Sequence, residues 1–135
     1  MKNSHHMLAG TLFATIALLF ATGTARAQDP VKVAPEHFKV LLDNDQVRVL
    51  EFHSKPGDKI LMHSHPDNFV YSFATGKTKF TYPDGKTDEV ETKAGEVTWR
   101  KAETHASEYV GTGEAHSLLV ELKGPAKKKT AKGTY

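Results

Sequence analysis

Residues 77–92 read KTKFTYPDGKTDEVET. Two runs of alternating side-chain character, Lys77 to Tyr82 and Lys86 to Thr92, flank the tripeptide Pro83-Asp84-Gly85. Alternation with a period of two is typical of strands that bury one face, and a Pro-Asp-Gly tripeptide is typical of a tight turn. The stretch therefore predicts a β-hairpin.

The same period of two recurs on both sides of this hairpin. Arg48, Leu50 and Phe52 alternate with their neighbours, and further strand-like runs lie at 96–100, 105–110 and 115–122. Turn-forming residues separate them at 55–58, 94–95 and 111–113, and no segment between residues 37 and 122 sustains helical spacing. We expect eight or nine short strands in an all-β sandwich or barrel, because one open sheet of that width would leave a face and two edges exposed.

Composition narrows the possible chemistry. A chain of 135 residues accommodates one compact domain, and it contains no cysteine. The absence of cysteine excludes disulfides, thiolate metal sites, iron–sulfur clusters and cysteine nucleophiles. Any bound metal must therefore be held by nitrogen or oxygen.

Residues 1–27 have the features of a cleaved signal peptide. Lys2 precedes an uncharged apolar run from Met7 to about Thr22, and Ala25 and Ala27 have the spacing that signal peptidase reads. The alternative is a retained anchor, but the run is shorter than the roughly 20 residues needed to span a bilayer. We expect cleavage after Ala27, a periplasmic or secreted bacterial protein that begins at Gln28, and no stable membrane anchor.

The two ends of the mature chain differ from its body. Residues 28–36 predict an extended lead-in segment or linker, and residues 123–135 form a Lys-rich tail that we expect to be flexible. The tail either keeps the protein soluble or touches an anionic surface. The leader and the tail carry much of the positive charge, so the body is acidic, and a dedicated nucleic-acid binder is not expected.

Two of the six histidines in the mature chain are spaced as partners. In a strand, residues i and i+2 lie on one face about 6.6 Å apart at Cα, so His63 and His65 can converge on one ion. Surface histidines also fall at this spacing by chance, so the pair alone leaves both interpretations open.

Residues 57–76 read GDKILMHSHPDNFVYSFATG, which resembles the first motif of the cupin family, Gly-x5-His-x-His-x3-4-Glu-x6-Gly. Gly57, His63, His65 and Gly76 fall in register, whereas Phe69, or Val70 with the longer spacing, occupies the glutamate position. Residues 95–109 resemble a degenerate second motif, Gly-x5-Pro-x-Gly-x2-His-x3-Asn. His105 matches its histidine one residue early, Tyr109 replaces the asparagine, and no proline or second glycine matches.

This resemblance implies a jelly-roll barrel, also called a double-stranded β-helix, over residues 37–122. It further implies that His63, His65 and His105 hold a divalent transition metal: Fe, Zn, Ni or Cu. Some cupin relatives, cysteine dioxygenase among them, run oxygen chemistry on three histidines without the glutamate. The alternative is a degenerate, metal-free cupin.

Four other residues are candidates for the pocket or for supporting the ion. Alternation from His63 and His65 puts Asp67 and Tyr71 on the same face, where Asp67 is a ligand or a turn former and Tyr71 presents a hydroxyl. Trp99 is expected to fill the barrel interior. His116 shares a face with Leu118 and Val120, as an inward nitrogen or a core histidine.

Two functions remain open. One is a metal-dependent oxygenase or lyase/isomerase acting on a small organic molecule; the other is a non-catalytic module that binds a small ligand or a metal. No catalytic acid or base is identifiable, and the absence of Gly-x-Ser-x-Gly argues against a serine hydrolase. Exposed edge strands make a homodimer possible.

Overall fold

The computed structural model describes residues 28–124, which contain one short helix and nine strands. The elements are α1 (Pro30–Val33), β1 (Phe38–Asp43), β2 (Val47–Ser54), β3 (Lys59–His65), β4 (Asn68–Ser72), β5 (Gly76–Thr81), β6 (Thr87–Thr92), β7 (Val97–Arg100), β8 (Glu103–Tyr109) and β9 (Ala115–Leu122). The prediction of an all-β fold with eight or nine strands is confirmed. The predicted signal peptide and all but the first two residues of the tail lie outside the described residues.

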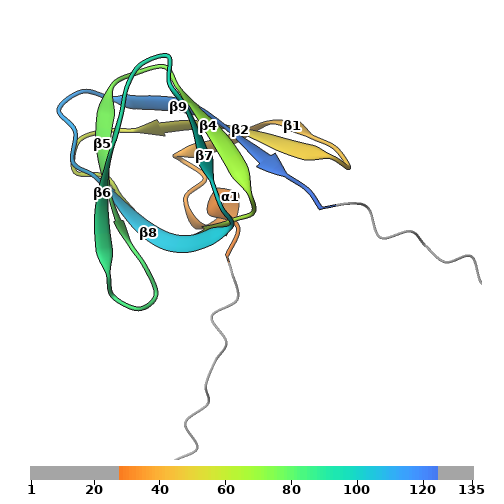
Figure 1. Ribbon diagram of the computed structural model, residues 1–135, viewed down its shortest axis with the longest axis horizontal. Coiled ribbons are helices and arrows are strands. Elements are labelled where there is room, and N and C mark those ends of the chain that lie inside the picture. The colour runs from red at the N-terminus through yellow and green to blue at the C-terminus, as the bar shows by residue number, and fades with distance from the viewer. Residues whose placement is uncertain (1–27, 125–135) are drawn as a thin grey trace, which may run out of the picture.

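The strands form two antiparallel sheets. One has five strands in the order β1-β2-β9-β4-β7, and the other has four in the order β3-β8-β5-β6. Consecutive strands often lie in different sheets, so the chain crosses between the sheets repeatedly. Figure 1 shows the two sheets curving around a common interior. Among residues 28–124, no helix is long and apolar enough to span a membrane.

The hairpin at residues 77–92 forms as its sequence indicates. β5 pairs with β6 from Gly76 and Thr92 to Thr81 and Thr87. The turn is closed by Gly85 N–H donating to Tyr82 O at 2.9 Å and by Lys86 N–H donating to Asp84 Oδ1 at 3.0 Å. Gly85 adopts a φ of 82°, which a residue without a Cβ reaches at no steric cost.

The apolar core contains residues of both sheets. Leu50 of β2 and Leu119 of β9 are register partners, and both are buried against Phe38 and Ile60. Each fully buried side chain of this size contributes about 1.5–3 kcal/mol relative to an exposed one. The core therefore joins β1, β2 and β9 of the larger sheet to β3 of the smaller sheet.

The extended conformation predicted for the lead-in segment is wrong over α1. Asp29 caps this helix through a bond from Val31 N–H to its Oδ1 at 3.0 Å, and Pro30 occupies the first turn, where its missing N–H costs nothing. Pro30 is fully buried, and Ala34, just after the helix, joins the apolar core. α1 packs against β1 and β3, because its apolar residues are more stable under the sheets than in an exposed linker.

The two glycines that match the first motif, Gly57 and Gly76, are required for different structural reasons. Gly57 has a φ of 90°, in the left-handed region that L side chains rarely adopt. Gly76 sits against the ring of Tyr109, and an added Cβ would lie 2.7 Å from the tyrosine oxygen. Both positions therefore require a residue without a side chain.

The outer face of the five-stranded sheet is unusually apolar. Phe69 pairs with Trp99 between β4 and β7, and Tyr71 pairs with Val97 two residues further along. Trp99 is 51% exposed and Val97 62% exposed. The interior and the exterior of this sheet thus both carry large apolar side chains.

Candidate metal centre

Three buried histidines lie close together on the inner face of the four-stranded sheet. His63 and His65 alternate along β3, and the register of β3 with β8 places His105 directly opposite His63. The ring centroids are 4.9 Å apart for His63 and His65, 4.7 Å for His63 and His105, and 5.6 Å for His65 and His105. All three are at most 6% exposed. The structure therefore brings together the three residues that the sequence motifs single out, which we call the buried triad.

Two of the three imidazoles are held by hydrogen bonds through Nδ1. His63 Nδ1 donates to the carbonyl oxygen of Leu61 at 2.8 Å. His65 Nδ1 donates to Glu121 Oε1 at 2.7 Å, and the other oxygen of Glu121 accepts from Arg48 Nε at 2.6 Å. A neutral imidazole that donates from Nδ1 has a free lone pair on Nε2. Both rings are therefore fixed in the tautomer that binds metal through Nε2.

His105 has a looser version of the same arrangement. Its Nδ1 lies 3.4 Å from Glu103 Oε1 and makes no hydrogen bond of good geometry. The same carboxylate oxygen accepts from Arg100 Nε at 2.5 Å, and the Arg100 guanidinium lies 4.4 Å from the centre of the Phe80 ring. A carboxylate with an arginine behind it thus stands beside His105, as it does beside His65.

The surroundings set the charge of these groups at neutral pH. Burial, reinforced by the neighbouring histidines, lowers the pKa of His63 to about 4, and burial also lowers the pKa of His105. Burial acts to raise the pKa of Glu103, but the nearby His105 ring and the hydrogen bond from Arg100 outweigh it and bring that pKa to about 2. At neutral pH His63 and His105 are therefore neutral, with an ionised carboxylate beside His105.

These features fit a divalent transition ion. One ligand atom from each histidine lies within 4.8 Å of the other two, and no acidic residue is part of this group. Three convergent imidazoles, buried with their Nδ1 atoms turned toward acceptors, would leave three lone pairs facing one another unless they share an ion. Such a set suits Zn²⁺, Fe²⁺, Ni²⁺ or Cu²⁺ with further coordination positions open.

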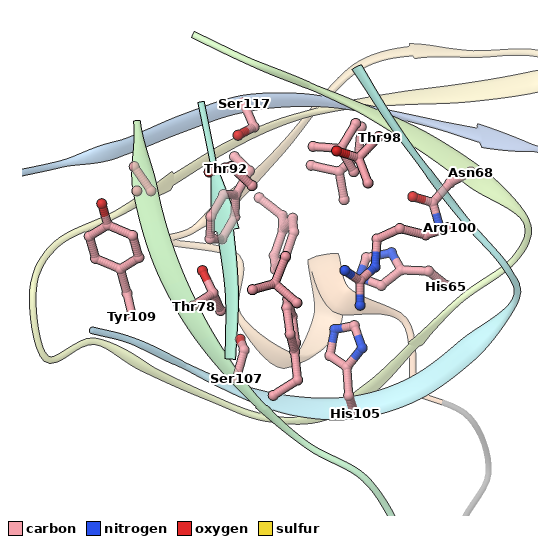
Figure 2. Close-up of a pocket in the computed structure, with 18 of the residues that line it drawn as sticks. His65, Asn68, Thr78, Thr92, Thr98, Arg100, His105, Ser107, Tyr109 and Ser117 are labelled. Carbon is pink, nitrogen blue, oxygen red and sulfur yellow. The ribbon is translucent and has the colours of Figure 1, made fainter. Parts of the chain in front are cut away.

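A cavity of about 110 Å³ adjoins the buried triad. Its wall is largely apolar, and six of its side chains are Phe38, Phe52, Val70, Phe80, Val90 and Leu119. Figure 2 shows His65, His105 and Arg100 gathered on one side of this cavity and Tyr109 on the opposite side. The volume exceeds the roughly 10–15 Å³ that one water needs, so a small organic molecule fits there.

Besides His105 Nδ1, two polar atoms of residues in the cavity wall have no partner in the described part of the chain. They are the Tyr109 hydroxyl and Asn68 Oδ1, both fully buried. A buried polar atom without a hydrogen bond is unfavourable by about 1–3 kcal/mol. A molecule in the cavity that donates to Asn68 would relieve this at Asn68, whereas the Tyr109 hydroxyl lies against Gly76 and Gly111.

Four charged residues of the site were not found from the sequence: Arg48, Arg100, Glu103 and Glu121. The sequence does contain a sign of two of them. Arg48 lies two residues before Leu50, and Glu121 lies two residues after Leu119, so each charge shares a strand face with a buried leucine. An inward charge on a strand requires a partner, and the register of β2 with β9 makes Arg48 and Glu121 neighbours.

Three predicted pocket residues lie elsewhere. Tyr71 and Trp99 are on the outer face of the five-stranded sheet, and neither lines the cavity. Asp67 is a turn former: its Oδ1 accepts from Ala102 N–H at 2.7 Å and its Oδ2 from Lys101 Nζ at 3.2 Å. The prediction extended the alternation of β3 through Pro66 into β4. Because β3 and β4 belong to different sheets, the residues after this turn that continue the alternation point outward instead of inward.

The prediction for His116 is only partly right. The residue contributes to the cavity lining, but its imidazole does not join the buried triad. His116 Nε2 donates to Glu51 Oε1 at 3.0 Å, and its ring stacks on His53 with centroids 4.2 Å apart. It belongs to a second group of potential ligands made of Glu51, His53 and His116.

Comparison with solved structures identifies the fold. A cupin domain from Bordetella pertussis Tohama I matches with a TM-score of 0.59 and 25% identity, over 64% of this chain and 92% of that chain. The protein has the cupin fold. A conserved protein with a double-stranded β-helix domain from Klebsiella pneumoniae matches this cupin with a TM-score of 0.52 and 22% identity, over 67% of this chain and 78% of that one.

A third structure supports the same architecture. It is an RmlC-like cupin from Methanocaldococcus jannaschii, with a TM-score of 0.51 and 11% identity over 64% of this chain and 78% of that one. No protein-family model and no curated protein sequence matches this cupin. Its fold is thus shared with known proteins, and its chemistry has to be argued from its own residues.

Proposed function

We propose that this cupin is a metal-dependent oxygenase whose ion is held by His63, His65 and His105 and whose substrate is a small, largely apolar molecule. The observation that carries the proposal is the arrangement of the buried triad. Two of its Nδ1 atoms donate to fixed acceptors and the third faces a carboxylate, so the three Nε2 atoms remain as ligands beside a cavity. A redox-active ion such as Fe²⁺, when bound there, would supply the electrons that activate O₂.

The chain's own residues orient the ligands and exclude water. Glu121, held by Arg48, fixes the His65 ring, and the Leu61 carbonyl oxygen fixes the His63 ring. Arg100 holds Glu103 next to His105. The apolar wall excludes water from the reacting groups, which strengthens every electrostatic interaction inside the cavity.

Oxygen chemistry is better supported than a lyase or isomerase reaction. Such reactions need a group that moves a proton near neutral pH. Among the described residues that line the cavity, Glu103 has a pKa of about 2, and burial raises the pKa of Tyr109 above its ordinary value of 10. Neither group exchanges protons readily at neutral pH.

The cavity restricts the substrate. Its apolar wall favours an aliphatic or aromatic body, and the unpaired Asn68 Oδ1 favours a polar group on the substrate. The volume of about 110 Å³ is several times the roughly 10–15 Å³ that one water needs, which suits a substrate the size of a small phenol. Small phenols, diketones and thiols meet these requirements.

The test is O₂ consumption by iron-loaded protein on a panel of such compounds. We expect turnover with at least one class, lost in His65→Ala, and no turnover with free Fe²⁺ at the same concentration. O₂ consumption that persists in His65→Ala would refute the assignment of the ion to the buried triad.

Glu103 stays ionised at neutral pH and so does not act as an acid there, which also supports a second function, a binding module without turnover. In that case a panel compound should bind saturably, with a measurable heat, while the iron-loaded protein consumes no O₂. Saturable binding together with substrate-dependent O₂ consumption would exclude this second function.

We also propose that the protein is exported, with its signal peptide removed after Ala27. In support, the residues just after this point belong to the folded domain: the Gln28 carbonyl oxygen accepts from Ser64 N–H at 2.9 Å, and Asp29 caps α1. Protein from a bacterial periplasmic fraction should begin at Gln28 by N-terminal sequencing. Full-length protein confined to the cytoplasm would contradict the proposal.

A further inference from the structure

A second set of potential metal ligands lies between β2 and β9. His53 and His116 are register partners on these two strands, and Glu51 lies two residues before His53, on the same face of β2. One ligand atom from each residue lies within 4.8 Å of the other two. We call these three residues the surface cluster, because His53 is 54% exposed and the other two side chains are about one-third exposed.

The spacing of the ligand atoms matches that around a tetrahedral ion. Glu51 Oε1 lies 3.0 Å from His116 Nε2 and 3.4 Å from His53 Nε2. Two ligand atoms that each lie about 2.0–2.1 Å from a zinc ion in tetrahedral geometry are roughly 3.3 Å apart. The carboxylate oxygen therefore lies at about this spacing from both nitrogens, and all three ligand atoms lie within 4.8 Å of one another.

The rings are already held in place. The imidazoles of His53 and His116 stack with centroids 4.2 Å apart and planes 16° apart, and Phe73 contacts the His116 ring at 4.4 Å. The bond from His116 Nε2 also lowers the pKa of Glu51, so its carboxylate is ionised at neutral pH. A metal ion lies in the plane of each imidazole that binds it, so one of the two stacked rings has to turn out of the stack when they share an ion.

We propose that Glu51, His53 and His116 form a second metal site, for a divalent ion of the Zn²⁺, Ni²⁺ or Cu²⁺ type. Two imidazoles and one carboxylate are a donor set that these ions accept, with the remaining position open to water or another ligand. The site is distinct from the buried triad and does not depend on the proposed oxygenase function.

The proposal predicts a change of tautomer. In the ion-free protein, His116 donates from Nε2 to Glu51, so its proton sits on Nε2. Coordination through Nε2 requires that proton to be on Nδ1. The ¹⁵N resonances of the two ring nitrogens distinguish these tautomers for each histidine.

The experiment is a Zn²⁺ titration of the full chain followed by imidazole NMR and calorimetry. We expect the resonances of His53 and His116 to move together in a saturable event, with His116 changing to the Nδ1–H tautomer. Per-residue signals are needed because His5 and His6 near the N-terminus can also bind Zn²⁺.

Three variants sharpen the result. His116→Gln and Glu51→Gln should each weaken this event at least tenfold while the event at His63, His65 and His105 is unchanged. Glu108→Gln, which removes a partly exposed carboxylate whose only described ion pair is with Lys59, should leave both events unchanged. The variants' folding is checked by far-UV circular dichroism.

Two outcomes would overturn the proposal. One is wild-type protein in which millimolar Zn²⁺ moves the triad resonances and leaves those of His53 and His116 in place. The other is a folded His116→Gln variant that keeps the second event at full affinity. Loss of the triad event alone would refute the proposed function and leave this site standing.

Discussion

The two groups of potential metal ligands in this cupin differ in what holds their nitrogens. In the buried triad, His63 and His65 donate from Nδ1 to acceptors that are not ligands themselves, which leaves Nε2 free. In the surface cluster, His116 donates from Nε2 to Glu51, so the binding atom is occupied by the third ligand. Metal binding at the buried triad would use nitrogens that are already free, whereas metal binding at the surface cluster would require a proton to leave His116 Nε2.

This difference indicates which features of a site determine its affinity for a metal ion. Ligand identity is similar in the two groups, but only the buried triad has supporting partners and exclusion from water, and such partners govern ring orientation and ligand basicity. We therefore expect the buried triad to bind a divalent ion more tightly than the surface cluster.

The largest expected effect is loss of a triad ligand. His105→Ala should lower the affinity for Zn²⁺ at the buried triad by more than about 100-fold, because a direct ligand matters more than the 10–100-fold typical of its supporting partners. His53→Ala, which removes an exposed imidazole, should leave that affinity unchanged. The measurement is metal content after gel filtration, combined with calorimetry. Stoichiometric retention of the ion in His105→Ala would show that the triad is not the site.

The next effect is a pH dependence of stability that only the buried group should produce. The pKa of His63 is about 4 in the folded protein and about 6.5 when unfolded, so the unfolded chain binds an extra proton between these values. The free energy of unfolding of the ion-free protein should therefore fall as pH drops from 6.5 to 4. At about 1.4 kcal/mol per pH unit, the loss is about 3 kcal/mol.

Urea unfolding of ion-free protein between pH 7 and 4.5 measures this dependence. The lowered pKa of His105 acts in the same direction, whereas Glu103, with a pKa of about 2, loses its contribution only below this window. His63→Gln should flatten the profile, and His53→Gln should not. A wild-type profile that is already flat would contradict the burial argument.

The buried triad was predictable from sequence because its geometry is local and its motif is short. His63 and His65 share a face by alternation, and one strand pairing, β3 with β8, is enough to add His105. The hairpin at 77–92 was predictable for the same reason, since a turn and two flanking runs specify it.

The supporting partners and the cavity wall depend on contacts far apart in the chain. Glu121 reaches His65 across 56 residues, because β9 lies between β2 and β4 in the larger sheet, and no motif encodes that order. The helical turn at Pro30 was missed because propensity in four residues is weak, and burial against β1 and β3 decides it.

Glu121→Gln tests the partner rather than the ligand. The amide can still accept from His65 but no longer carries the charge that stabilises the ring, so Zn²⁺ affinity at the buried triad should fall 10–100-fold. The matched change Glu51→Gln removes a carboxylate that also faces an imidazole, yet it should not alter this affinity. Calorimetry on both variants decides the point. Equal affinities in wild type and Glu121→Gln would mean that the ion does not depend on this support.

The smallest effect concerns the two faces of one sheet. Trp99 is half exposed on the outer face, whereas Phe38 is buried inside. Trp99→Ser should therefore change the free energy of unfolding by less than about 1 kcal/mol, against about 3–5 kcal/mol for Phe38→Ala. Trp99 is also the single tryptophan, so its fluorescence reports directly on its surroundings. Since Trp99 does not line the cavity, Zn²⁺ at the buried triad or a small phenol in the cavity should leave the emission maximum unchanged. A shift of that maximum on ligand binding would place Trp99 at the cavity after all, and would mean that the face of β7 is reversed.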